Sequence, residues 1–245
     1  MKVYCIFLTL LVLGCSSPTT RQPAKELPEE DSRFEMSRDV HWMRNSAEYK
    51  AIVLQIYRLA GLRLGELVAG KKPGTWAVSL DFDETVIDAS DFNKEWDLTG
   101  KKFTEELWDT WVSGRKDPPL PGAVEFLELV HNLGGYIAFV TNRSSFNCPD
   151  AEANLRAFDI PFDVVLCRGE DSQKESRWET VEKGVTSADL PPLEIVMWLG
   201  DNIRDFPELD QSLRLESEEA FSNFGDIYFA FPNATYGSWQ KNPQN

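Results

Sequence analysis

Three carboxylates lie close together in the stretch "AVSLDFDETVID", residues 77–88. An apolar run leads directly into Asp81, and Asp83 and Glu84 follow after a single Phe. Carboxylates this close repel one another and lose hydration where a strand is buried, so a chain keeps them when a cation or a reaction needs them. The stretch therefore predicts a functional site at the end of a buried strand.

Other polar groups stand at or near the ends of further apolar runs. "YIAFVTN" and "EIVMWLGD" both end in polar residues, and a lysine lies in "SQKESRW" between them. The groups concerned are Thr141, Asn142, Arg143, Lys174, Asp201 and Asp205. In a parallel sheet the carboxyl ends of the strands meet at one edge, so we expect these side chains to converge with Asp81.

The elements that must position these groups alternate between strand and helix. Short apolar runs at 75–83, 136–142, 163–167, 194–201 and 226–232 predict five strands. Amphipathic segments lie between them, and the spacing over 40–70 predicts a helix that ends at Gly70. This alternation is typical of an α/β fold with a parallel sheet sandwiched by helices. The aromatic, charged stretch 88–120 is too long for a simple loop, and we expect it to project over the carboxyl edge of the sheet.

The inventory of groups suits a hard divalent cation and phosphoryl transfer. Mg²⁺ is held by a few carboxylates together with waters and substrate phosphate. A calcium loop needs Gly at its sixth and Glu at its twelfth position, and "DFDETVIDASDF" has neither. A zinc site is disfavoured by two His residues and no paired Cys motif. In phosphoryl transfer one Asp can attack phosphorus, a second can handle the proton, and a hydroxyl and a Lys can hold the remaining oxygens.

Four ordered motifs resemble those of the haloacid dehalogenase (HAD) superfamily, and within it the class C lipoprotein acid phosphatases of bacteria. "DFDET" matches the DxDxT motif, "FVTNR" the second motif, Lys174 the third and "GDNIRDF" the fourth. The flanking segments "WMRNSAEYKA", "WVSGRKDPPLPGAVEF" and "FPNATYGSW" are also similar to these enzymes, so the likeness covers residues 40–239. It implies a HAD-type Rossmann-like sheet with a small, mainly helical cap, formed by the N-terminal helices and the insertion at 88–120.

The resemblance implies catalytic and metal-binding roles for the matched acidic residues. Asp81 would be the nucleophile and a Mg²⁺ ligand. Asp83 would be the general acid/base and give its backbone carbonyl to the metal. Asp201 would complete the protein ligands, with Asp205 in support.

The resemblance also implies substrate contacts for a nucleoside 5'-monophosphate or another organic phosphate ester, nicotinamide mononucleotide included. Thr141 and Lys174 would bind the phosphate, with Lys183 as the alternative lysine and Asn142 as a further substrate contact. Trp108 and Tyr236 match positions where a base is stacked without base-specific hydrogen bonds. A second interpretation makes Trp108 a core aromatic. Arg143 is either a structural partner of the acidic cluster or a substrate ligand.

The N-terminus predicts export. Lys2 and the apolar run that follows it resemble a signal peptide over residues 1–14, and Cys15 matches a lipobox cysteine that becomes lipidated. The alternative is ordinary cleavage near Ser16 or Ser17. Residues 15–39 are rich in Pro, Ser and charge and predict a flexible tether, so the phosphatase domain is expected at 40–245. These features place the chain on the bacterial cell envelope, at the outer membrane, facing the periplasm or the surface.

The charge balance and the cysteines limit the partners. A net charge of -15 disfavours a nucleic-acid polymer as partner. The family suggests a homodimer, and Cys148 and Cys167 either pair or stay separate. Two rival functions remain. One is a surface lipoprotein whose main role is to bind a ligand such as haem, and the other is phosphotransfer to an alcohol instead of water.

Overall fold

The computed structural model of the chain describes residues 35–100 and 103–244. At its centre lies a five-stranded sheet in the order β3-β2-β1-β4-β5, and all neighbouring strands are parallel. The strands are β1 (Trp76–Leu80), β2 (Tyr136–Ser144), β3 (Val164–Arg168), β4 (Glu194–Gly200) and β5 (Tyr228–Ala230). The predicted parallel α/β sheet is confirmed.

The register of the central strands brings their carboxyl ends to one level. Leu80 of β1 lies opposite Phe139 of β2 and Leu199 of β4. The residues that follow each of these positions therefore emerge at the same edge of the sheet. Every residue of β1 is buried, as expected for a central strand covered on both faces.

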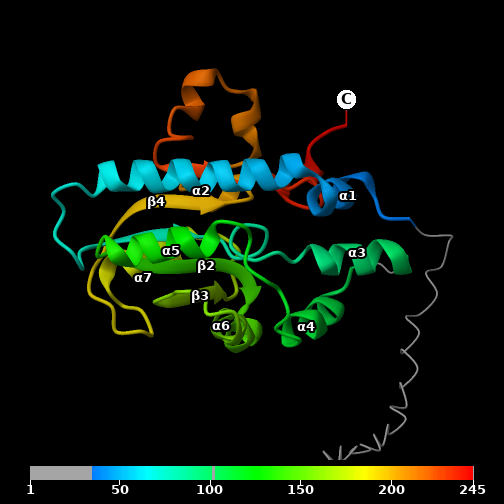
Figure 1. Cartoon of the computed structure of the whole chain (residues 1–245), viewed down its shortest axis with the longest axis horizontal. Coiled ribbons are helices and arrows are strands. Elements are labelled where there is room, and N and C mark those ends of the chain that lie inside the picture. The colour runs from blue at the N-terminus through cyan, green and yellow to red at the C-terminus, as the bar shows by residue number, and fades with distance from the viewer. Residues whose placement is uncertain (1–34, 101–102, 245) are drawn as a thin grey trace, which may run out of the picture. The chain divides into compact units, whose positions relative to one another are not determined.

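Helices cover both faces of the sheet (Figure 1). Side chains of α2 (Ala47–Leu67), α5 (Ala123–Asn132) and α6 (Cys148–Ala157) form one core cluster with Trp76, Val78 and Leu80 of β1. On the other face α7 (Glu175–Lys183) packs its Trp178 and Val181 with Ala77. The alternation of side chains along β1 thus divides the core between the two faces.

The helix expected over 40–70 is two helices. α1 (Arg38–Asn45) and α2 are separated by Ser46, which has extended backbone angles and whose hydroxyl accepts a hydrogen bond from Tyr49 N at 3.0 Å. A serine that caps the following helix competes with continuation of the preceding one, which is why an apparently continuous pattern breaks here. α1 begins at Arg38, one residue before the expected end of the tether at residue 39.

The insertion at 88–120 carries α3 (Ser90–Thr99) and α4 (Glu105–Ser113). α1 lies against α3, with Arg44 Nη1 2.9 Å from Ser90 Oγ and Arg44 Nη2 2.6 Å from Asp91 Oδ1. Figure 1 shows α1, α3 and α4 at the same end of the domain. They form the small helical cap that the resemblance implied.

Short 3₁₀ helices and a disulfide complete the domain. The 3₁₀ helices are Ser145–Asn147, Ile203–Asp205, Gln211–Leu215, Glu218–Phe221 and Ser238–Lys241. Cys148 at the start of α6 and Cys167 in β3 form a disulfide with a Cα–Cα distance of 5.8 Å, so these two cysteines pair. Within the described ranges no helix is long and apolar enough to cross a membrane. The predicted signal peptide and Cys15 lie outside the described residues.

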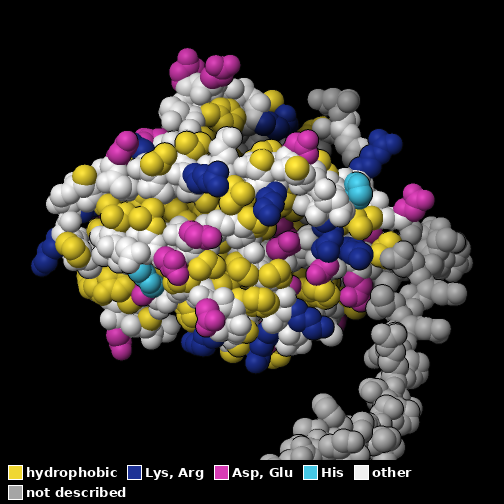
Figure 2. Space-filling model, in the orientation of Figure 1, with side chains coloured by type: hydrophobic (Ala, Val, Ile, Leu, Met, Phe, Trp, Pro, Cys, Tyr) yellow, Lys and Arg dark blue, Asp and Glu magenta, His cyan; other side chains and the backbone are white. Residues whose placement is uncertain are grey.

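Charged side chains of both signs are scattered over the face that Figure 2 shows. Lys and Arg side chains alternate there with Asp and Glu, and no continuous basic patch covers this face. A nucleic-acid polymer needs such a patch to neutralise its phosphates.

Candidate active site

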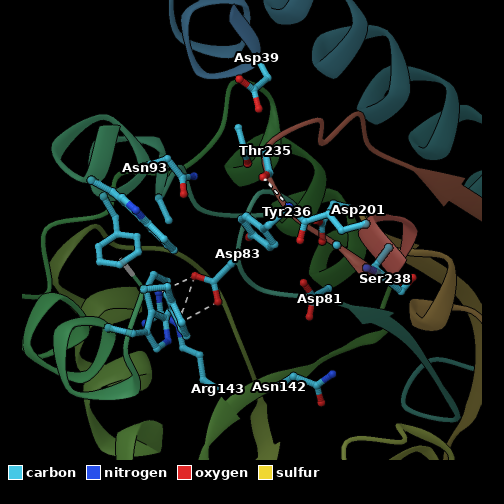
Figure 3. A pocket seen from close by; sticks show the side chains of 18 of the residues that line it. Asp39, Asp81, Asp83, Asn93, Asn142, Arg143, Asp201, Thr235, Tyr236 and Ser238 are labelled. Atoms are coloured by element: carbon cyan, nitrogen blue, oxygen red, sulfur yellow. Dashed lines mark hydrogen bonds and ion pairs between the residues drawn. The ribbon is translucent and has the colours of Figure 1, made fainter. Parts of the chain in front are cut away.

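The predicted site residues other than Lys174 line one pocket at the carboxyl edge of the sheet (Figure 3), and Lys174 is buried next to it, in contact with two of them. Its volume is about 840 Å³, which is within the usual range for small-molecule sites. Its walls include Asp81, Asp83, Trp108, Thr141, Asn142, Asp201, Asp205 and Tyr236. β1, β2 and β4 supply the floor, and the insertion and the C-terminal segment supply the sides.

Three carboxylates form the centre of the pocket floor, and the buried ammonium of Lys174 contacts two of them. One oxygen each of Asp81, Asp201 and Asp205 lies within 4.8 Å of the other two. Lys174 Nζ lies 2.5 Å from Asp81 Oδ1 and 2.7 Å from Asp205 Oδ1. At the other end of α7, Lys183 is exposed and pairs with Glu179, so Lys174 is the lysine at this edge.

A glycine allows Asp205 to approach the strand end. A Cβ atom on Gly200 would lie 2.2 Å from the Cβ of Asp205, a distance that no side chain tolerates. Asn202 and Asp205 form a reciprocal capping box around the 3₁₀ turn, with Asn202 N 2.8 Å from Asp205 Oδ2. The "GDNIRD" pattern thus folds locally so that two carboxylates four residues apart face the same cluster.

The hydrogen bonds of the cluster distinguish the carboxylates from one another. Both oxygens of Asp205 are engaged, one by Lys174 and the other by Asn202 N. Asp81 uses one oxygen for Lys174, and Asp201 uses one for Asn233 Nδ2 at 2.7 Å. A second oxygen therefore remains on Asp81 and on Asp201 for a cation. Hard carboxylate oxygens of this kind fit Mg²⁺, and Asp205 fits a supporting role.

The electrostatics of the cluster favour an added positive charge. Burial raises the pKa of Asp81, although the Lys174 ammonium opposes the shift. Burial, together with the charges of Asp81 and Asp205, raises the pKa of Asp201 well above its usual value. Burial alone lowers the pKa of Lys174, but the charges of Asp205 and Asp81 outweigh it and raise that pKa. A single buried lysine thus offsets only part of the negative charge of three carboxylates.

Arg143 pairs with the second aspartate of the DxDxT motif. Its Nη2 lies 2.7 Å from Asp83 Oδ1 and its Nε 3.0 Å from Asp83 Oδ2, and Nη2 also lies 3.3 Å from Asp117 Oδ2. The guanidinium carbon stands 4.6 Å from the Phe82 ring centre and 5.4 Å from that of Trp108. Of the two interpretations left open for Arg143, this structure supports the structural partner of the acidic cluster.

Thr141 and Asn142 lie near the carboxyl end of β2 and line the pocket in different ways. Thr141 is buried, and its hydroxyl oxygen accepts a hydrogen bond from Arg143 N at 3.1 Å. Asn142 is exposed, and its Oδ1 accepts a hydrogen bond from Arg177 Nη2 at 2.8 Å.

Sequence and structure comparisons place this constellation in a known family. Residues 15–239 match the family described as HAD superfamily, subfamily IIIB (acid phosphatase). The chain belongs to this family. It is therefore an acid phosphatase, and the fold and enzyme class expected from the motifs are confirmed.

Two solved structures of the class C acid phosphatase from Bacillus anthracis are similar to this acid phosphatase. One matches with a TM-score of 0.74 and 28% sequence identity, and covers 82% of this chain and 85% of that chain. The other, with tungstate bound, matches with a TM-score of 0.72 and 27% identity over the same shares of both chains. The likeness thus extends over most of the phosphatase domain.

Aromatic rings form the sides of the acid phosphatase pocket. Trp108 packs edge-to-face on Phe92, with ring centres 5.0 Å apart, and it also lines the pocket. The Tyr236 hydroxyl donates a hydrogen bond to the buried Glu84, which fixes the orientation of the tyrosine ring. Trp111 turns inward, and its Nε1 donates to Asp117 Oδ1 at 2.8 Å. Trp108 therefore combines contact with the aromatic cluster and exposure to the pocket.

Two residues that sequence reasoning missed support the acid phosphatase site. Asp117 is buried and bonds both Trp111 and Arg143, and its only signal is an acid directly before a Pro pair in "KDPPL". Arg177 donates hydrogen bonds to the backbone oxygen of Thr141 and to Asn142, which holds the end of β2. The sequence signal that could have identified Arg177 is its spacing: it follows Lys174 by three residues, which places the two side chains on the same face of a helix.

Proposed function

We propose that this acid phosphatase is a Mg²⁺-dependent phosphomonoesterase, exported and lipid-anchored, that hydrolyses nucleoside 5'-monophosphates, nicotinamide mononucleotide and other organic phosphate esters. The observation that carries the proposal is the cluster of Asp81, Asp201 and Asp205 at the floor of an aromatic-walled pocket, in contact with the buried Lys174. Such a floor suits a phosphate, and such walls suit a planar ring.

The proposed reaction has two steps. A carboxylate oxygen of Asp81 attacks phosphorus, the bond to the alcohol oxygen breaks, and Asp83 gives its proton to that leaving oxygen. Asp83 then takes a proton from water, and the oxygen of that water attacks phosphorus and releases Asp81 and inorganic phosphate. Thr141 and Lys174 hold the non-bridging oxygens of the phosphoryl group, which neither attack nor leave.

Asp81 and Asp201 would hold Mg²⁺ through their remaining oxygens, with Asp205 as a support fixed by Lys174 and Asn202. When bound, the ion supplies positive charge that offsets the repulsion between the Asp81 carboxylate and the phosphate. Burial raises the pKa values of Asp81 and Asp201, and a bound cation would offset the cost of keeping these buried carboxylates ionised. The related enzyme solved with tungstate, a tetrahedral oxyanion, also supports a phosphate site in this fold.

The substrate class follows from the sides of the pocket. Trp108 and Tyr236 both line it, and stacking of a base on aromatic rings stabilises a complex by roughly 1–3 kcal/mol while tolerating many bases. A nucleotide presents both a phosphate and a planar ring, so it can contact the floor and the sides together. Small esters without a ring would use the floor alone.

Export and lipidation rest on the N-terminal sequence. The family match begins at residue 15, the lipobox cysteine, which is where a mature lipoprotein would begin. An extracytoplasmic phosphatase would convert charged nucleotides into nucleosides that are taken up more readily. Labelling with palmitate should mark the wild type and leave a Cys15→Ala chain unlabelled. The homodimer that the family suggests is checked by analytical ultracentrifugation.

The decisive experiment measures phosphate release by the soluble domain without residues 1–15. AMP, nicotinamide mononucleotide and glycerol 2-phosphate are each offered with Mg²⁺ and with EDTA, beside Asp81→Asn. We expect turnover that requires Mg²⁺, favours the two nucleotides and is absent in Asp81→Asn. Equal turnover of all three esters would keep the phosphatase and reject the stacking role of Trp108 and Tyr236. Turnover that survives in Asp81→Asn would reject the proposed nucleophile.

A further inference from the structure

Asn93 is a buried amide that faces the pocket. It lies on α3, only 9% of its surface is exposed, and it lines the pocket. Among the described residues its side chain has no hydrogen-bond partner. Figure 3 shows Asn93 on the α3 side of the pocket, away from Asp81 and Asn142. It therefore lies at the end of the pocket remote from the phosphate floor.

The polar atoms of Asn93 are not among the fully buried, unpartnered atoms of the described residues, and Asn93 lines the pocket, so its amide can find its partners there. Polar groups in folded proteins are nearly always hydrogen-bonded, to protein or to water. A leucine has almost the same size and would line the same wall without any hydrogen-bonding group. Water can satisfy the amide in the empty pocket, but a ligand that displaces this water restores the hydrogen bonds only if it has polar atoms at the same place.

The position of Asn93 is fixed from both sides. Near the C-terminal end of α3, Asp97 Oδ2 accepts hydrogen bonds from Ser37 N at 2.8 Å and Ser37 Oγ at 2.5 Å. At the N-terminal end, Ser90 Oγ accepts a hydrogen bond from Arg44 Nη1 at 2.9 Å. Asn93 lies between these two anchors, so Ser37 and α1 hold this part of the α3 backbone in place before a ligand binds. A helix that is already ordered loses little entropy on binding.

The surroundings of Asn93 indicate the shape of its ligand. Phe92 and Trp96 on the same helix line the pocket, as do Trp108 and Tyr236. Flat rings accept a flat group between or against them. An amide presents one donor and one acceptor in a plane, which matches the polar edge of a nucleobase or a carboxamide.

We propose that Asn93 is a specificity residue that hydrogen-bonds the polar edge of the ring in the alcohol part of the ester. The pocket then prefers rings with a polar substituent at this edge over rings of the same size without one. This inference rests on the proposed function and deepens it. It also departs from the expectation that stacking alone selects the base.

The test compares two nucleotides that differ in one polar group. AMP and purine riboside 5'-monophosphate share the phosphate, the ribose and the purine ring, but the latter lacks the exocyclic amino group. We expect the wild type to favour AMP about five- to tenfold in kcat/KM, as for one lost hydrogen bond. In Asn93→Leu the ratio should fall to about one, whereas Asn132→Leu, the same change at an exposed site on α5, should keep it.

Two controls keep the outcome clear. The first control is turnover of glycerol 2-phosphate by Asn93→Leu, which at the wild-type rate shows that the variant is folded and that its phosphate site is intact. If Asn93→Leu does not fold, Asn93→Ala is used in its place. A wild-type ratio of one, or a ratio unchanged in the Asn93 variant, overturns the inference while leaving the phosphatase in place. If the wild type hydrolyses neither nucleotide, the proposed function fails. Calorimetry then measures the affinities of the wild type for the two nucleotides, and equal affinities overturn the role of Asn93.

Discussion

The guanidinium of Arg143 binds both carboxylate oxygens of Asp83, at 2.7 Å through Nη2 and at 3.0 Å through Nε. Arg143 is almost fully buried and shares Nη2 with Asp117. The residue proposed to carry the proton is therefore oriented by a buried cation that is itself held by a second carboxylate. Positioning of Asp83 depends on a partner 60 residues away in the chain.

Replacing Arg143 by Ala should destabilise the protein and reduce turnover. The buried carboxylate of Asp117 and the partly buried one of Asp83 would lose their shared partner, which costs about 3–5 kcal/mol in the free energy of unfolding. Urea denaturation checks this value. Because Asp117→Asn removes one of the two stranded charges, Arg143→Ala/Asp117→Asn should be less destabilised than the sum of the two single variants. Additive losses would show that the three groups do not act as one network.

Lys174→Met should lower kcat/KM for every phosphate ester by about 100- to 1000-fold, the usual effect of removing one donor that stabilises a transition state. The change removes the only ammonium that contacts Asp81 and Asp205 among the described residues. Lys183→Met, on the exposed end of the same helix, is the matched control and should keep wild-type kinetics. A similar loss in both variants would contradict the assignment of Lys174 to the site.

Trp108→Leu should reduce kcat/KM for AMP by about 5- to 150-fold, as for the loss of one stacking contact of roughly 1–3 kcal/mol. Turnover of glycerol 2-phosphate, which has no ring to stack, should change little. Tyr236→Phe keeps the ring but loses the hydrogen bond to Glu84, so it should retain the preference for nucleotides. If Trp108→Leu still prefers AMP over glycerol 2-phosphate as the wild type does, Trp108 is a core aromatic and does not stack on the base.

Glu84 should make the metal-free protein less stable as the pH rises. Burial and then the charge of Asp83 raise the pKa of Glu84 well above its usual value, although the hydrogen bond from Tyr236 opposes the shift. The folded protein therefore keeps a proton that the unfolded chain loses above a pKa of about 4.3. The free energy of unfolding is highest below that pKa and falls as the pH rises toward the raised one.

Thermal unfolding in EDTA between pH 5 and pH 8 tests the role of Glu84. Glu84→Gln should resemble the wild type at pH 5 and gain on the order of a few degrees in Tm at pH 8, because a neutral amide carries no proton to lose. Glu128→Gln, an exposed change on α5, serves as the control and should leave the pH dependence unchanged. Parallel Tm curves for wild type and Glu84→Gln would contradict this role.

Most of the fold was accessible from local patterns. The five strands follow from short continuous apolar runs, the helices from an apolar period of 3.6 residues, and the parallel sheet from their alternation. The break between α1 and α2 at Ser46 could not be predicted from the sequence. A capping serine within an amphipathic run looks like any other polar residue on a helix surface. Pairing of Cys148 and Cys167 was equally open, because it depends on the Cα–Cα distance of 5.8 Å that the sheet and α6 establish.

The chemical class of the site was determined by the sequence alone. Asp81, Asp83, Lys174 and Asp201 stand in short motifs whose spacing limits what they can do, and parallel strands bring their ends to one edge whatever the loops contain. Which groups partner them was decided only by the tertiary structure. The contact of Arg143 with Asp117 and the exposure of Asn93 to the pocket each depend on side chains from separate elements. No local pattern encodes such distances, because they are set when the insertion and α1 pack over the edge of the sheet.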